Sequence, residues 1–273
     1  MTRCLFVSDL HGRKDRYRKL FRHLAAAPPA VLLLGGDLLP LGDPGFLELQ
    51  LIEGCRRLKR GLGERYPLLL LIPGNDDPRS LEPGLEAGER EGLWRCLHGR
   101  SLSFGEHRFY GYACIPPSPF LLKDWERYDV SRHVDVGCLA PEEGWHSVPA
   151  GDTGTIQEEL GRLAGEEDLS RAVFLFHVPP YGGLLDLAQS GGREVDHVPM
   201  DAHVGSIAVR RFIEARQPLL TLHGHVHESS RLTGCWRERI GGSHCFSAAW
   251  DGPELALVAF DLEELEAAER LLA

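Results

Sequence analysis

The segment LLLLIPGNDDP, residues 68–78, joins an unbroken apolar run to a polar cluster at a tight turn. The same arrangement occurs twice upstream, in CLFVSDLHG at 4–12 and in VLLLGGDLLP at 31–40. Helical patterns at about 13–26 and 44–62 separate the three apolar runs. Apolar strands that alternate with helices are typical of β-α-β units, whose parallel sheet is buried on both faces. These residues therefore predict an α/β fold.

The rest of the chain continues this alternation and then adds an antiparallel part. Further elements are predicted as strands at 172–176 and 218–222, a hairpin at 101–113, helices at 155–165 and 203–216, short antiparallel strands over 230–261, and a closing amphipathic helix at 264–273. Residues of about 114–154 are rich in Pro, Gly and Trp without periodicity, and predict an irregular excursion over the surface. No linker or repeat interrupts the sequence, so we expect a single domain over 1–273.

Composition narrows the classes of function. The chain of 273 residues carries a formal net charge of −10, and its basic tract RRLKR, at 56–60, falls in a helical pattern. We therefore expect no extended nucleic-acid partner. The seven cysteines are scattered without a C-x-x-C pair, which argues against a disulfide framework or a thiolate zinc site and fits a reducing compartment. No apolar stretch approaches the roughly 18 residues of a membrane span, and MTR leads directly into a strand, so a soluble cytoplasmic protein is predicted.

Polar side chains with metal-binding capacity follow five of the predicted strands. They are Asp9, His11, Asp37, Asn75, His177, His223, His225 and His227. Most clusters have an ordinary explanation when taken alone: Asp-x-His can cap a helix, Gly-Asp is a common turn, and a single histidine is often structural. Only Gly-His-Val-His at 224–227 favours a metal by itself, because alternate residues of an extended segment can turn two imidazoles to one side. Ligands of open α/β sheets bind outside the carboxyl ends of the strands, however, and this placement brings all the clusters to one edge of one sheet. We therefore expect them to form one site.

The number and type of these side chains indicate two metal ions. Three carboxylate or carboxamide ligands and at least four imidazoles are too many for one tetrahedral zinc. They suit two neighbouring divalent ions that share a bridging carboxylate, with Mn²⁺ favoured and Fe or Zn²⁺ also compatible. Two ions about 3.5–4 Å apart are what in-line phosphoryl transfer to water uses. The residues thus predict a phosphoester hydrolase.

The ordered set of motifs resembles that of the calcineurin-like metallophosphoesterases. The family pattern is D-x-H, G-D, G-N-H-[DE], a strand-end His, and G-H-x-H. This sequence offers Asp9-Leu-His11, Gly36-Asp37, Gly74-Asn75-Asp76-Asp77, His177 and Gly224-His225-Val226-His227, in that order. The segments 203–228 and HVPPYGG before it resemble a prokaryotic branch of small Icc-like phosphoesterases.

The resemblance implies a four-layer α/β/β/α sandwich with mixed sheets and a dinuclear metal site. By family analogy one metal takes Asp9, His11 and His227, and the other takes Asn75, His177 and His225. Asp37 would bridge the two metals, with a hydroxide as the second bridge. His223, which alternates with His225 and His227, is predicted to lie outside this set.

The sequence departs from the family pattern at Asp76, where the family has a histidine that helps to protonate the leaving oxygen. A carboxylate near two cations stays ionised, so Asp76 is a poor general acid, and we carry over its position but not its role. Its negative charge predicts that diesters, or substrates with good leaving groups, are preferred over alkyl monoesters. His203, predicted to head a helix, and His197, in the preceding loop, are alternative proton donors, although a helix-capping or surface histidine is the commoner explanation of each. Asp77 before Pro78 predicts a helix N-cap.

The predicted function is therefore a metal-dependent phosphoesterase that acts on a small phosphoester substrate, with a diester favoured and no membrane partner. The alternative is a non-catalytic scaffold of the same fold that binds a protein partner. Nuclease activity is a third reading that shares the metals, and the charge of −10 argues against it. The physiological substrate and the oligomeric state stay open at this point.

Overall fold

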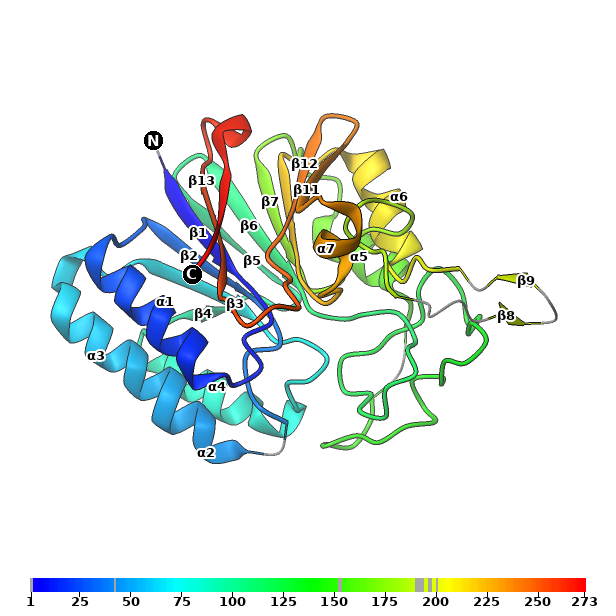
Figure 1. Ribbon diagram of the computed structural model, residues 1–273, viewed down its shortest axis with the longest axis horizontal. Coiled ribbons are helices and arrows are strands. Elements are labelled where there is room, and N and C mark those ends of the chain that lie inside the picture. The colour runs from blue at the N-terminus through cyan, green and yellow to red at the C-terminus, as the bar shows by residue number, and fades with distance from the viewer. Residues whose placement is uncertain (1, 42, 152–153, 190–193, 196–197, 200) are drawn as a thin grey trace.

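Two mixed sheets of six strands each lie face to face, and helices cover their outer sides (Figure 1). The computed structural model describes residues 2–41, 43–151, 154–189, 194–195, 198–199 and 201–273. The arrangement confirms the predicted α/β/β/α sandwich with mixed sheets.

The first sheet is built around the apolar runs that open the sequence. Its strands, in spatial order, are β14 (Glu269–Leu272), β13 (Ala256–Asp261), β1 (Arg3–Val7), β2 (Val31–Gly35), β3 (Leu68–Ile72) and β4 (Arg95–Cys96). The strands from β1 to β4 pair in parallel, and β13 and β14 complete the sheet in antiparallel fashion. The residues of β2 are buried along their whole length, as a continuous apolar run predicts for a parallel strand covered on both faces.

The second sheet holds the remaining predicted strands. Its strands, in spatial order, are β11 (Arg237–Ile240), β12 (Ser243–Ser247), β10 (Leu220–His223), β7 (Ala172–Phe176), β6 (His107–Tyr112) and β5 (Arg100–Phe104). The inner four strands are parallel, whereas β5 and β11 are antiparallel to their neighbours. A separate ribbon pairs β8 (Glu194–Val195) with β9 (Val198–Pro199).

Helices bury their apolar faces on the two outer sides of the sheets. On the side of the first sheet lie α1 (Lys14–Ala26), α2 (Pro44–Phe46), a π-helical stretch (Leu47–Ile52), α3 (Glu53–Leu62), 3₁₀ turns (Gly63–Arg65, Arg79–Leu81) and α4 (Glu82–Arg90). On the side of the second sheet lie α5 (Ile156–Ala164) and α6 (Ile207–Arg216), and α7 (Ser229–Thr233) follows β10. One apolar core joins the first sheet to α1, α3 and α4, and the other fills the space between the sheets and reaches α5 and α6.

The predicted closing helix is wrong. Residues 264–273 form a short 3₁₀ turn, Leu265–Ala267, and then strand β14. The composition of this segment favours a helix, but its backbone N–H and C=O groups pair instead with the open edge of β13, in register from Ala256↔Leu272 to Ala259↔Glu269. Pairing at a sheet edge therefore overrides the local helix propensity.

The described residues between β6 and α5 contain no helix or strand, and Figure 1 shows them as irregular green loops. A buried ion pair fixes this segment, since Lys123 Nζ lies 2.7 Å from Glu126 Oε2 and both side chains are 0% exposed. Trp125 Nε1 donates a hydrogen bond to the carbonyl of Asp77 at 2.6 Å. The segment is therefore packed against the loop that follows β3.

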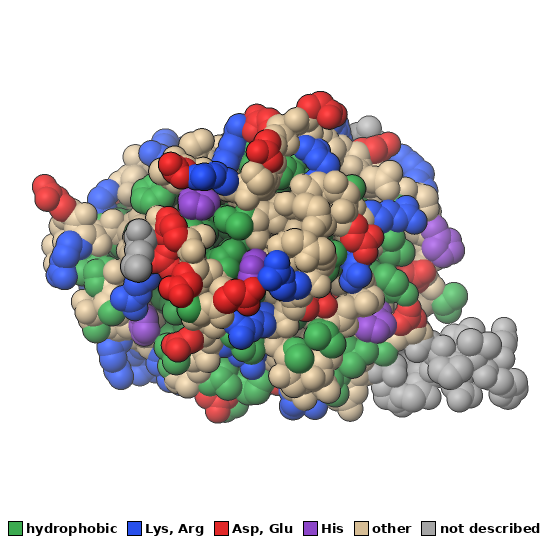
Figure 2. All heavy atoms as spheres, turned by 90° about the horizontal axis from the view of Figure 1, so that it is seen from above, with side chains coloured by type: hydrophobic (Ala, Val, Ile, Leu, Met, Phe, Trp, Pro, Cys, Tyr) green, Lys and Arg blue, Asp and Glu red, His purple; other side chains and the backbone are tan. Residues whose placement is uncertain are grey.

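On the face drawn in Figure 2, basic side chains are interspersed with acidic ones. Among the described residues, no helix combines the length and the apolar character needed to cross a bilayer.

Candidate metal centre

The predicted ligands gather where five parallel strands end. Strands β1, β2 and β3 of the first sheet and strands β7 and β10 of the second sheet each lead directly into one of the polar clusters. The expectation that all clusters lie at the edge of one sheet is wrong, because β6, β7, β10 and β12 form a sheet of their own. The centre therefore lies where the carboxyl ends of the two sheets meet.

The first group of side chains comprises Asp9, His11, Asp37 and His227, whose potential ligand atoms all lie within 4.8 Å of one another. The Nε2 atoms of His11 and His227 are 3.0 Å apart. His227 Nε2 lies 3.2 Å from Asp9 Oδ1, and His11 Nε2 lies 3.8 Å from Asp37 Oδ2. Oxygen and imidazole ligands thus face a common point.

The second group comprises Asn75, His177 and His225, and it shares Asp37 with the first. His177 Nε2 lies 2.9 Å from Asn75 Oδ1 and 3.4 Å from Asp37 Oδ2. The rings of His177 and His225 are 5.1 Å apart between centroids. The structure therefore brings together all seven side chains that the resemblance implied, with Asp37 next to both groups.

The donor and acceptor pattern of the second group fits a cation. His177 Nδ1 lies 2.8 Å from the carbonyl of Gly35, which can only accept, so Nδ1 carries the proton and Nε2 has a free lone pair in the neutral ring. This lone pair faces Asn75 Oδ1 and Asp37 Oδ2, which are acceptors as well. Three acceptors that converge need either an extra proton or a positive ion between them.

Electrostatics at the cluster point the same way. Asp9 and Asp37 are 1% and 2% exposed. Among the described residues, the cationic groups within 4 Å of these carboxylates are imidazoles rather than Lys or Arg. Burial pushes the pKa of both carboxyl groups up, but the hydrogen bond and charge of His227 on Asp9, and the charge of His177 on Asp37, hold each pKa below its usual value. Both groups are thus ionised and buried, a combination that divalent cations would stabilise.

The imidazoles respond in opposite directions. Burial opposes the charged form of His177, but the carboxylates of Asp37 and Asp9 outweigh it and raise the pKa of His177 to about 9. Burial and the neighbouring His177 lower the pKa of His225 to about 3. The site thus draws positive charge to one ring and leaves the other as a neutral nitrogen ligand, which is the form that binds metal.

The backbone at the cluster is strained. Among the described residues, five that are not glycine have positive φ, and four of these are predicted ligands: Asp9 (56°), His11 (46°), Asp37 (50°) and His225 (71°). Such conformations are uncommon outside glycine and persist only where the surroundings enforce them, most often at functional sites. The strain supports a functional role for these positions.

Two glycines allow the ligand loops to approach one another. A Cβ atom on Gly74 would lie 2.2 Å from Asp37 Oδ1, and one on Gly224 would lie 2.7 Å from Asp9 Oδ2. Both distances are far below a carbon–oxygen contact. Glycine is therefore required at these positions for the carboxylates to sit where they do.

Asp77 has a different role from the predicted helix cap. The next helical turn begins at Arg79, and the Asp77 carboxylate accepts hydrogen bonds from the backbone N–H groups of Leu38, Leu39 and Gly74. Burial and the neighbouring negative charge of Asp37 raise its pKa to about 7, against the effect of these N–H donors. Asp77 thus ties the loop after β2 to the loop after β3.

His203 and His223 have hydrogen-bond partners other than the predicted ligands. His203 precedes α6, whose N-cap is Ser206, and its Nδ1 lies 2.8 Å from Asp186 Oδ1 rather than at one of the predicted ligands. His197 lies outside the described residues. His223 is 0% exposed, donates from Nδ1 to the carbonyl of Val178 at 3.0 Å, and has its pKa lowered to about 4 by burial. It is buried in the core, where its two ring nitrogens face Val178 and Thr221.

Arg16 was missed by the sequence interpretation. It is buried on α1, and its guanidinium donates to the carbonyl of Asp9 at 2.7 Å and to that of Gly252 at 2.6 Å. These bonds hold the strained Asp9 turn against the loop that precedes β13. The available signal was its spacing, because Arg16 is four and eight residues before the buried Leu20 and Leu24.

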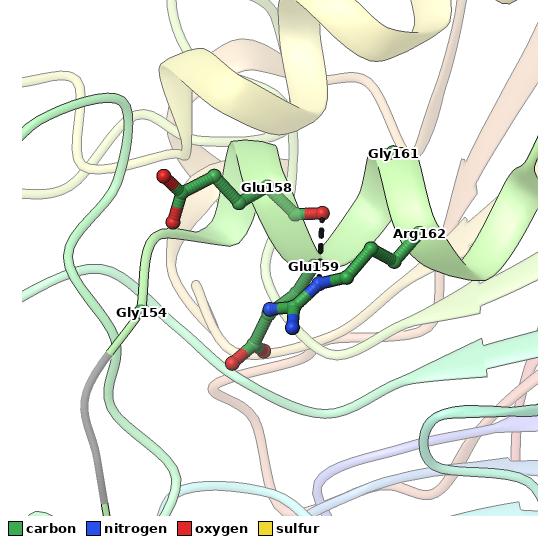
Figure 3. Close-up of a pocket in the computed structure, with 5 residues that line it drawn as sticks. All are labelled: Gly154, Glu158, Glu159, Gly161 and Arg162. Atoms are coloured by element: carbon green, nitrogen blue, oxygen red, sulfur yellow. Dashed lines mark hydrogen bonds between the residues drawn. The ribbon is translucent and has the colours of Figure 1, made fainter.

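A surface depression on α5 is a separate feature (Figure 3). It has a volume of about 700 Å³ and is lined by Gly154, Glu158, Glu159, Gly161 and Arg162, none of them a predicted ligand. Arg162 Nε donates to the carbonyl of Glu158 within the same helix. Because none of the predicted ligands lines this depression, we place the site at the strand-end cluster instead.

A two-sheet sandwich places buried carboxylates and imidazoles, a donor set that could hold a metal ion, at its strand ends. A profile of the calcineurin-like phosphoesterase family matches residues 2–229, so the chain belongs to this family and the predicted resemblance is confirmed. A solved structure from Thermus thermophilus superposes with a TM-score of 0.59 at 18% identity, over 99% of this chain and 98% of that one. A dimetal phosphatase from Danio rerio gives 0.53 at 14% identity, over 94% and 91%. These two likenesses show the fold alone, and comparison with curated proteins gives no match.

Proposed function

We propose that the protein hydrolyses small phosphoesters, with a preference for diesters, at a centre of two divalent cations. The observation that carries the proposal is the convergence of ligand atoms from both sheets, within 4.8 Å in the first group, around carboxylates that are buried without Lys or Arg partners among the described residues. When bound, two such ions supply positive charge for the phosphoryl oxygens and a more acidic water for the attack.

Two groups of residues would each hold one of these ions. By family analogy, one ion would bind to Asp9, His11 and His227, and the other to Asn75, His177 and His225. Asp37 would contact both, which is supported by its distances of 3.8 Å to His11 Nε2 and 3.4 Å to His177 Nε2. Mixed oxygen and imidazole ligands suit Mn²⁺, with Fe or Zn²⁺ as alternatives.

The preference for diesters follows from Asp76. Its carboxylate side chain is 40% exposed and lies 3.3 Å from His11 Nδ1, at the rim of the centre. A negative charge there repels a monoester dianion more strongly than a diester monoanion. The net charge of −10 likewise disfavours a long polyanion, so we propose a small substrate rather than a nucleic acid. We place the protein in the cytoplasm, since its seven cysteines are free of disulfides.

The test is a panel of nitrophenyl monoesters, diesters and cyclic nucleotides assayed with added Mn²⁺, alongside the metal content of the purified protein. We expect about two ions per chain, a higher kcat/KM for diesters, and a shift toward monoesters in Asp76→His. Asp37→Asn should abolish turnover, whereas Asp15→Asn, which removes an exposed charge on α1, should not.

The competing scaffold function predicts a different result. A protein that binds no metal under metal-replete conditions and hydrolyses none of the panel would refute the enzyme and support a partner-binding role. A strong preference of the wild-type protein for monoesters would refute only the argument from the charge of Asp76.

A further inference from the structure

Asp76 contacts one ligand from each of the two metal groups. Its Oδ2 lies 3.3 Å from His11 Nδ1, and its Oδ1 accepts a hydrogen bond from Asn75 Nδ2 at 3.0 Å. Its backbone N–H donates to Asp37 Oδ1 at 2.8 Å. One residue therefore reaches both groups and the carboxylate between them.

These contacts set which atom each ligand presents. A carboxylate accepts only, so His11 carries its proton on Nδ1 and turns the lone pair of Nε2 toward His227 Nε2, 3.0 Å away. In the same way, Asn75 points its NH₂ group at Asp76 and its oxygen toward the second group. Each oxygen of Asp76 thus fixes the orientation of one ligand.

We propose that Asp76 is a positioning residue that orients His11 and Asn75 at once and so couples the two metal positions. The inference rests on the metal centre of the proposed function. Carboxylates that hold the far nitrogen of a ligating histidine typically change metal affinity 10- to 100-fold when they are removed. A histidine at position 76 would have only one accepting nitrogen, so it could not accept hydrogen bonds from both His11 and Asn75.

The experiment measures Mn²⁺ binding by calorimetry in the wild type, Asp76→Ala, Asp76→Asn and Ser8→Ala. Ser8 is the matched control, because its buried hydroxyl donates to Asp9 alone and so supports only the first group. We expect Asp76→Ala to weaken both ions about 10- to 100-fold, and Ser8→Ala to weaken only one. Asp76→Asn, which keeps one accepting oxygen, should fall between the wild type and Asp76→Ala.

A second measurement needs no metal. The ¹⁵N shifts of His11 in the metal-free protein, at a pH where the ring is neutral, should report the Nδ1–H tautomer in the wild type and lose that bias in Asp76→Ala. Unchanged binding of both ions, weakening of a single ion, or an unchanged tautomer in folded Asp76→Ala would overturn the inference. A wild type that binds no Mn²⁺ would instead overturn the proposed function itself.

A different observation concerns Phe120, whose ring is 47% exposed beside the predicted ligand His225. The two rings meet edge to face, with centroids 6.3 Å apart and an interplanar angle of 90°. The backbone N–H of Phe120 donates to Ser118 Oγ at 3.0 Å, and the carbonyl of Ser118 accepts from the buried Lys123 Nζ at 2.8 Å. An exposed aromatic ring is thus held in place next to the centre.

We infer that Phe120 is a specificity-determining residue that stacks on a flat aromatic group of the substrate. The ring adjoins a predicted ligand, so a phosphorus atom at the centre would place its ester groups within reach of the exposed face. Aromatic rings stack on one another with a preference that a methyl group does not share. This inference also rests on the proposed function, and it names diesters with an aromatic ester group as the favoured class.

The test compares two diesters with the same nitrophenyl leaving group, in which the second ester group is phenyl or methyl. Phe120→Ala should lower kcat/KM for the phenyl diester about 5- to 10-fold more than for the methyl diester. Leu121→Ala, which truncates the neighbouring side chain of 69% exposure, should not discriminate between them. An equal loss on both diesters, or no loss, would refute the inference, whereas a wild type that hydrolyses neither would refute the proposed function.

Discussion

Replacing Asp77 by alanine is expected to lower the free energy of unfolding by about 3 to 5 kcal/mol. The carboxylate is 2% exposed and accepts hydrogen bonds from the backbone N–H groups of Leu38, Leu39 and Gly74, at 3.0, 2.8 and 2.9 Å. A buried N–H group left without a partner costs about 1 to 3 kcal/mol, and water that enters the new cavity recovers part of the total. The bonds join the loops after β2 and β3, so metal binding should weaken as well.

The assay is equilibrium unfolding in urea of the metal-free protein. Asp77→Asn keeps one accepting oxygen and should lose about 1 to 3 kcal/mol. Asp15→Ala removes an exposed carboxylate on α1 and should stay within about 0.5 kcal/mol of the wild type. If Asp77→Ala loses less than about 1 kcal/mol at an unchanged m-value, the bonds do not join the loops as argued.

Three further predictions concern the core and the centre. The pKa of His223 is about 4 in the folded protein, against the reference value of 6.5 that applies to the unfolded chain. Between these two values the unfolded chain binds the extra proton, so stability falls as the pH drops from 6.5 toward 4. From pH 7.5 to pH 5, the difference in the free energy of unfolding between the wild type and His223→Asn, measured in urea, should shrink by about 2 kcal/mol. Free energies of unfolding that change in parallel with pH in the two proteins would contradict this. Gly74→Ala places a Cβ 2.2 Å from Asp37 Oδ1 and should abolish turnover and lower Tm, so an active variant with unchanged Tm would refute the packing argument. Lys123→Met should lower the free energy of unfolding by about 3 to 5 kcal/mol in the same assay, and the double variant Lys123→Met with Glu126→Leu should lower it much less. A double variant that is no more stable than the single one would contradict this.

The elements that position the site could be predicted from the sequence because their signals are local. The apolar runs at 31–34, 68–72 and 172–176 coincide with β2, β3 and β7 to within a residue. Parallel strands of one sheet bring their carboxyl ends together, so the polar residues after β2 and β3, such as Asp37 and Asn75, had to converge. That step needs no knowledge of loop geometry.

What could not be predicted depends on contacts between segments remote in sequence. The last residues pair with β13 because that edge is open, a fact that only the assembled sheet contains. Asp77 looks like a helix cap from its neighbours, but its partners Leu38 and Leu39 come from another loop. Helix α6 begins after Ser206 because that side chain caps it, which leaves His203 in the preceding loop. In each case a tertiary contact overrides a local preference.

The two sheets contribute different kinds of predicted ligand to the proposed centre. The first sheet supplies the predicted oxygen ligands Asp9, Asp37 and Asn75, together with one imidazole, whereas the loops of the second sheet supply imidazoles alone. Neither sheet holds a complete set, so the centre exists only when the two sheets pack on each other. The apolar core between them, in which Phe6 and Phe176 are fully buried, therefore sets the distance between oxygen and nitrogen ligands. Since such cores are close-packed, a change of side-chain volume there would change the distance between the oxygen and nitrogen ligands of the proposed metal centre.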